Sequence, residues 1–205
     1  MKLKKKVKVI LIIAIILIVA GLGFLAYESL QPKNVRTATV ENEIEEYGYT
    51  LKSTRNDRYK EMFQELKDIL SEDPVDEEAY LEQVSKMFIM DFYTLNDKLA
   101  STDVGGIDFV HTNAKTNFLE KAEDTVYKYV ESDIYGTRDQ ELPEVTDVTV
   151  EKVENIEYTI GTDVTDDNAY QVEVSLKYKE DMDYPTKATL IFVHEDNKLS
   201  LVEVE

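Results

Sequence analysis

The 205-residue chain contains no cysteine. Disulfide bonds, thiol nucleophiles, thiolate zinc sites and lipid attachment through cysteine are therefore excluded. A domain without disulfides must be stabilised by its core alone, which about 150 residues can supply.

Tryptophan is absent as well, and histidine occurs only twice, at His111 and His194. The two histidines do not form a nucleophile, base and orienting group that the sequence can support, so we expect both to be structural or exposed. No glycine-rich phosphate loop follows a predicted strand, so nucleotide hydrolysis has no motif. The sequence thus predicts no cofactor and no enzymatic activity, although its 42 acidic residues offer too many carboxylate pairs to single one out.

The segment DVTDDN, residues 163–168, gathers oxygen ligands that calcium accepts. It lacks the glycine and the terminal glutamate of an EF-hand loop. We therefore expect a hairpin turn at this segment and no metal site.

Acidic residues are missing from the first 27 positions, where all the charges are lysines, five in number. The rest of the chain, residues 28–205, carries 42 acidic and 18 basic side chains, a formal net charge of −24. A phosphate backbone would be repelled by such a domain, so nucleic acid is not an expected partner.

One segment, residues 9–27, has no charged residue at all. Its nineteen residues would reach about 28 Å as a helix, close to the thickness of the bilayer's hydrocarbon core. The preceding lysines place the N-terminus in the cytoplasm by the positive-inside rule. We expect an uncleaved, single-pass signal anchor in the cell membrane and an extracytoplasmic domain. The alternative is a cleaved signal peptide, whose apolar region is usually shorter and ends in a small-x-small site.

The remaining chain divides by the period of its apolar residues. Residues 1–8 form a basic cytoplasmic tail, residues 28–54 a tether and an arm or short strand lying on the domain, and residues 55–205 the extracytoplasmic domain. Apolar residues three and four positions apart predict three helices, the first over residues 56–70 and the second from an N-cap at Asp76. The third starts near Thr112, carries Tyr129 and Val130, and ends at or just before Gly136.

After Pro143 the period changes to two. Four alternating segments, around residues 148–160, 170–179, 187–195 and 198–205, predict antiparallel strands, and TDDN (165–168) and EDN (195–197) suit the turns of hairpins. The fold class is therefore α+β, with three helices packed on a curved four-stranded antiparallel sheet.

The stretch from residue 88 to residue 115 concentrates aromatic residues, a glycine pair and His111. It reads as the end of the second helix, a loop, a short strand over residues 107–111 and the start of the third helix. Burial explains its aromatic stripe, although a pocket remains an alternative. The residues expected to line either a pocket or the core are Tyr80, Phe88, Phe92 and Tyr129.

The order helix, helix, short strand, helix and four antiparallel strands resembles the nuclear-transport-factor-2-like cone fold. Behind a single N-terminal anchor, it is similar to the bitopic assembly proteins of type IV secretion and Gram-positive conjugation channels. The resemblance implies a scaffold of an envelope or transfer assembly, with other envelope proteins as partners and the lipid bilayer holding the N-terminal helix. The alternative function is a small-ligand-binding domain with a pocket between the sheet and the helices.

Overall fold

The computed structural model describes residues 17–19, 21–22, 34–162 and 164–205. The chain divides into two units, Met1–Val35 and Arg36–Glu205. Of the predicted membrane segment, residues 9–27, only residues 17–19 and 21–22 are among the described residues. Within the part of the chain that is described, no helix is both long enough and apolar enough to span a bilayer.

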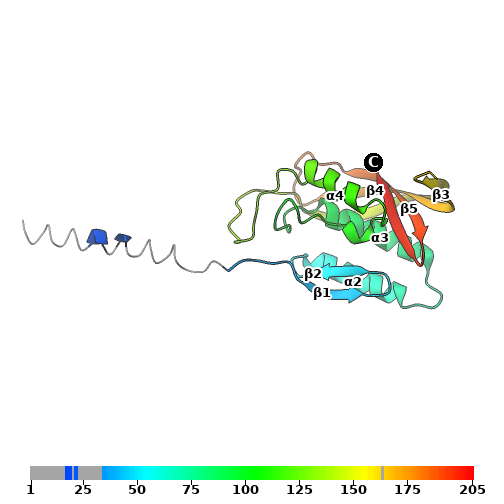
Figure 1. Ribbon diagram of the computed structural model, residues 1–205, viewed down its shortest axis with the longest axis horizontal. Coiled ribbons are helices and arrows are strands. Elements are labelled where there is room, and N and C mark those ends of the chain that lie inside the picture. The colour runs from blue at the N-terminus through cyan, green and yellow to red at the C-terminus, as the bar shows by residue number, and fades with distance from the viewer. Residues whose placement is uncertain (1–16, 20, 23–33, 163) are drawn as a thin grey trace, which may run out of the picture. The chain divides into compact units, whose positions relative to one another are not determined.

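The second unit is an α+β domain, as the sequence predicts. Its sheet has four antiparallel strands in the order β3 (Val145–Ile160), β4 (Val164–Tyr178), β5 (Lys187–Glu195) and β6 (Lys198–Val204). Consecutive strands are neighbours, so β3 and β6 are the two edges of the sheet (Figure 1).

The long hairpin of β3 and β4 turns at Gly161, whose φ is 67°. The prediction of a turn at residues 165–168 is therefore wrong, because those residues belong to β4. The prediction for residues 195–197 is confirmed: Asp196 has a φ of 56° and joins β5 to β6.

Helices α2 (Asp57–Leu70) and α3 (Glu77–Tyr93) begin where the sequence predicts. The Asn56 side chain accepts a hydrogen bond from the amide of Tyr59, and Asp76 accepts from the amides of Glu78 and Ala79. Helix α3 packs on α2 and on strands β3 and β4, so it is buried on most of its surface.

The region before α2 contributes two strands to the domain. Strands β1 (Val40–Ile44) and β2 (Tyr49–Lys52) form a hairpin, and the side chains of Tyr49 and Leu51 enter the core. The hairpin lies beside α2 (Figure 1), where Lys60 of that helix forms an ion pair with Glu41.

Two predictions between α3 and the sheet are wrong. Residues Ile107–Phe109 form the short 3-10 helix η1 instead of a strand, and the strand-like contact is a single parallel bridge from Val110 to Leu201. Helix α4 spans Lys115–Asp124 and stops well before Gly136. The hydroxyl of Thr125 donates to the carbonyl of Lys121, and the chain then turns inward.

Candidate functional site

A groove of about 380 Å³ lies between helix α4 and the edge strand β6. In Figure 1, α4 lies close to the red C-terminal strand. Ten of its fourteen lining residues are apolar in type, although polar and apolar atoms contribute about equally to its accessible surface; its charged residues are Lys121 and Glu203. It is the part of the described structure that best matches a pocket between sheet and helices.

Two aromatic rings in contact, those of Phe92 and Phe118, line the groove, and Phe88 lies behind Phe92 in the core. The ring centroid of Phe92 lies 5.3 Å from that of Phe118 and 5.4 Å from that of Phe88. The hydroxyl of Tyr127 donates to the carbonyl of Phe92 over 2.7 Å and accepts from the amide of Gly105 over 2.9 Å. This buried tyrosine therefore holds Phe92 against the loop that carries the glycine pair.

Only part of the outer edge of β6 is hydrogen-bonded to other segments of the chain. The amide of Leu199 donates to the hydroxyl of Tyr80 over 3.3 Å, and the carbonyl of Leu201 accepts from the amide of His111 over 2.8 Å. Thr189 and Glu205 exchange both backbone hydrogen bonds. In an antiparallel ladder the residue before such a pair points its backbone groups away from the neighbouring strand, so those of Val204 face outward.

His111 has a structural position beside this edge. Its Nδ1 accepts from the amide of Asn113, and its Nε2 lies 3.7 Å from Oε1 of Glu195. Glu195 also accepts hydrogen bonds from the amide of Thr112 and the hydroxyl of Ser200. Burial raises the pKa of Glu195, but these hydrogen bonds outweigh it and lower the pKa. The arrangement fastens residues 110–113 to the β5–β6 hairpin.

His194 belongs to a second polar group at the N-terminus of α3, the surface network. Its Nδ1 lies 2.9 Å from Oδ2 of Asp166 on β4, and its Nε2 lies 3.2 Å from Oε1 of Glu77. Tyr170 also hydrogen-bonds to Glu77. The two carboxylates bind opposite nitrogens of the ring, so they do not converge on one point. Among the residues described, no group of three or more such ligands is placed to hold a metal ion.

A cleft of about 170 Å³ adjoins this network and contains Lys198. The Lys198 ammonium donates to the carbonyl of Asp108 over 2.5 Å and lies 4.3 Å from the ring centroid of Tyr49. Burial lowers the pKa of Lys198 to about 8. These contacts of the Lys198 ammonium with Tyr49 and Asp108 hold β6 against η1.

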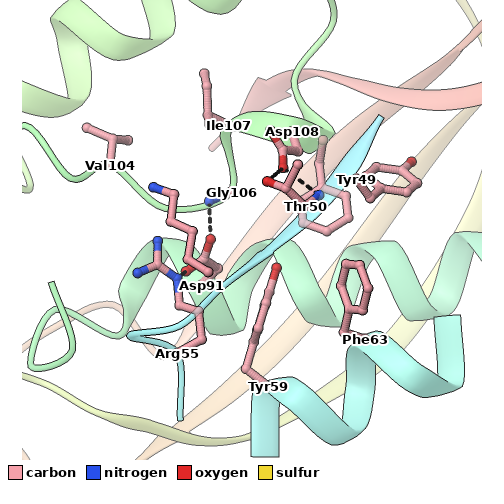
Figure 2. A pocket seen from close by; sticks show the side chains of 12 residues that line it. Tyr49, Thr50, Arg55, Tyr59, Phe63, Asp91, Val104, Gly106, Ile107 and Asp108 are labelled. Atoms are coloured by element: carbon pink, nitrogen blue, oxygen red, sulfur yellow. Dashed lines mark hydrogen bonds and ion pairs between the residues drawn. The ribbon is translucent and has the colours of Figure 1, made fainter. Parts of the chain in front are cut away.

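A third polar group, the buried network, is centred on Asp91 (Figure 2). Figure 2 shows Oδ1 of Asp91 beside Arg55, whose Nε lies 2.5 Å away, and Oδ2 accepting a hydrogen bond from the amide of Gly106. Nζ of Lys98, which is not drawn there, lies 3.1 Å from Oδ1. Burial alone would raise the pKa of Asp91, but the two cations and the amide hold it well below its usual range. The remaining space here is about 10 Å³, enough for about one water molecule and no larger ligand.

The glycine pair is explained by this network. A side chain at Gly105 would place its Cβ 2.1 Å from the carbonyl oxygen of Asp91. At Gly106 the Cβ would lie 2.7 Å from the ring of Phe88, and the φ of 73° is itself unfavourable for other residues. The loop needs both glycines in order to lie against α3.

The four residues singled out in the sequence lie in three different places. Phe88 and Phe92 are buried in the core, and Phe92 also borders the groove. Tyr80 is buried beside the cleft of Lys198. Tyr129 is 77% exposed, so it lines neither a pocket nor the core; because α4 ends at Asp124, Tyr127 turns inward in its place.

Sequence reasoning did not find the groove. The predicted third helix includes Phe118 and Val126, but nothing in its apolar spacing distinguished residues that border a groove from residues of the core. The alternation in β6 predicted a strand and did not indicate that this strand is an edge. Scans against protein-family models, curated proteins and solved structures found no match. The groove is therefore interpreted from its own geometry.

Proposed function

We propose that this chain is a membrane-anchored interaction domain that binds other envelope proteins outside the cytoplasm, without enzymatic activity of its own. The observation that carries the proposal is the groove between α4 and β6, with its aromatic lining and its partly open strand edge. Peptide recognition commonly uses a groove of this kind, in which a strand edge supplies backbone hydrogen bonds and side-chain pockets supply specificity.

The anchor is part of the same proposal. The uncharged run of residues 9–27 and the five lysines before it favour a single pass with the N-terminus in the cytoplasm. A reporter that is active only outside the cytoplasm, fused after Glu205, should then give signal, and the protein should keep its N-terminal lysines. A silent reporter on a membrane-bound chain would reverse the orientation, and an N-terminus near residue 26 would replace the anchor with a signal peptide.

The assembly role also remains a proposal. The order of α2, α3, α4 and the four-stranded sheet agrees with part of the element order on which the resemblance to the nuclear-transport-factor-2-like cone fold rests, whereas the short strand expected before α4 is the 3-10 helix η1. A scaffold of an envelope or transfer assembly would use its groove for a protein partner. The net charge of −24 on residues 28–205 argues against nucleic acid as that partner.

Photo-crosslinking in living cells tests the interaction. A photoreactive amino acid at Asn117 or Val126, both in the groove lining, should give discrete crosslinked partners with the full chain. The same amino acid at Val153, which is exposed on β3, is the matched control and should give only background. Equal, diffuse labelling at all three positions would contradict the proposal.

The alternative is a small-ligand-binding domain that uses the same groove. The volume of about 380 Å³ favours it, because ligand sites of roughly 300–1,000 Å³ are common. Native mass spectrometry of the purified chain should then reveal a bound molecule that is lost when Phe118 is replaced by aspartate. A groove that carries no small molecule but crosslinks to proteins would exclude this alternative.

A further inference from the structure

The two edges of the sheet differ in how they are protected. Edge strand β3 carries exposed charged side chains along its length and three irregularities in its pairing with β4. Charges and bulges on an edge prevent another strand from adding to it. The exposed acidic or basic residues of β3 that serve in this way include Asp147, Glu151, Lys152, Glu154 and Glu157.

Edge strand β6 is protected differently and less completely. The hydroxyl of Tyr80 and the amide of His111 already occupy its backbone groups at Leu199 and Leu201. Val110 lies on this edge as a one-residue parallel strand, so the chain itself uses strand addition there. The described residues provide no such partner for the outward amide and carbonyl of Val204, which lie at the groove.

Side chains alternate between the two faces of the sheet at this position. Val204 pairs with the core residue Leu190 and borders the groove. Glu205 borders a different depression, on the other face, whose other charged residues are Glu151, Glu173 and Lys187. Glu203 borders the groove, and its carboxylate also accepts a hydrogen bond from the hydroxyl of Tyr158 on β3. An added strand would therefore meet the groove, bordered by Lys121 and Glu203, on one face and a depression with three carboxylates and one lysine on the other.

We propose that the β6 edge at Val204 accepts an extended segment of a partner protein in which apolar and basic residues alternate. This inference rests on the proposed function and names the chemistry of the partner. The apolar residues of the segment enter the groove, its basic residues lie beside Glu203 and Glu205, and its backbone hydrogen-bonds to Val204. Opposite charges across a strand pair are favourable, and like charges directly opposite are unfavourable.

A second copy of the chain fits this edge less well. Two β6 strands paired edge to edge would bring Glu203 and Glu205 of each copy close to the same residues of the other. The domain as a whole is strongly acidic, so long-range repulsion acts in the same direction. A basic, alternating segment meets neither obstacle.

Binding of synthetic peptides to the full chain in nanodiscs tests the inference. A peptide of alternating valine and lysine should bind, and a peptide of alternating valine and glutamate should not. Hydrogen exchange should show slower exchange of the Val204 amide when the first peptide is present. Equal binding of the two peptides, or an unchanged Val204 amide, would overturn the inference.

Two variants make the test specific. Val204→Pro removes an outward donor and leaves the hydrogen bonds between Glu205 and Thr189 in place, so it should weaken peptide binding about tenfold. Val204→Ile keeps the donor and should bind normally. If the proline variant does not fold, Glu205→Lys serves instead: it should weaken the lysine peptide and strengthen the glutamate peptide. Unchanged affinities for both peptides would overturn the inference.

The outcome separates this inference from the function on which it rests. If the crosslinks from Asn117 persist in Val204→Pro, the proposal of an interaction domain stands and the proposal of strand addition is excluded. If the chain without the Val204→Pro substitution gives no crosslinks from the groove, both proposals are excluded. Sedimentation could instead reveal a dimer that Val204→Pro abolishes. The segment bound at the β6 edge would then belong to a second copy of the chain, and the proposal of a basic partner would be overturned.

Discussion

Asp91 and His194 each stand between two oppositely charged or hydrogen-bonding groups, but at different depths. The side chain of Asp91 is 10% exposed, and its partners Arg55 and Lys98 are 2% and 0% exposed. The side chain of His194 is 37% exposed, and that of its partner Glu77 is 51% exposed. Water screens the surface network and is nearly excluded from the buried one, so similar contacts should differ greatly in what their removal costs.

The largest effect is expected at the centre of the buried network. Asp91→Asn would remove the carboxylate that two buried cations share, leaving Arg55 with Asp103 at 3.5 Å and Lys98 with Asp97 at 2.5 Å. Breaking a buried pair typically costs about 3–5 kcal/mol, and these second partners place the expected loss near the lower end of that range. Urea unfolding of the full chain measures the loss. Lys98→Met in the same chain should add to the loss, because Asp97, whose side chain is 11% exposed, then loses the ammonium that lies 2.5 Å from it. A loss below about 1 kcal/mol would mean that this network is screened like the surface one.

The next effect is expected in the loop that brings Gly106 to Asp91. Gly106→Ala combines an unfavourable φ with a clash against Phe88, whereas Gly48→Ala combines a φ of 65° with open space. The control should cost about 1–2 kcal/mol from backbone strain alone, and Gly106→Ala should cost clearly more. Thermal unfolding of both variants checks the order. Equal losses would show that the loop can move away from α3.

A smaller, pH-dependent effect is expected in the surface network. Burial lowers the pKa of His194, but the hydrogen bonds and charges of Asp166 and Glu77 outweigh it and raise the pKa above 6.5. A raised histidine pKa stabilises the fold below about pH 6.5, and this stabilisation is lost as the pH rises through the folded-state pKa. The lowered pKa values of Glu77 and Asp166 contribute above about pH 4, and that contribution is lost as the pH falls.

The two windows overlap near about pH 5–6. His194→Gln should therefore lower the free energy of unfolding most in that range, by no more than about 1 kcal/mol, and least above about pH 8. Unfolding of both proteins across pH measures this difference. If the difference in the free energy of unfolding is the same at pH ~5 and pH ~8, His194 does not interact with the two carboxylates in the way described here.

The smallest effect is expected at Arg36, whose side chain is 50% exposed and pairs with Asp133. Its backbone amide also donates to the carbonyl of Ile134, and this bond survives a change of side chain. Arg36→Ala should cost a few tenths of a kcal/mol, about the value of an exposed ion pair, and the cost should vanish in high salt. A salt-independent loss above about 1 kcal/mol would place this pair with the buried network instead.

Local patterns in the sequence determined the fold class and most of its elements. The alternation after Pro143 predicted the four strands, and the spacing from Tyr59 to Leu70, together with Asp76, predicted helices α2 and α3. Those signals depend on neighbours within a few positions, which is why they can be read along the chain. The aromatic stripe of α3 likewise predicted that Phe88 and Phe92 are buried.

The tertiary structure alone decided the end of α4, the groove and both polar networks. Tyr127 turns inward because its hydroxyl joins the carbonyl of Phe92 to the amide of Gly105, 35 and 22 positions away. His194 meets Glu77 across 117 positions, and Val110 meets Leu201 across a single bridge. Contacts at such separations depend on how the elements pack. They leave no periodic pattern in the sequence, so hydrogen bonding and burial determine them without any local signal that could be read along the chain.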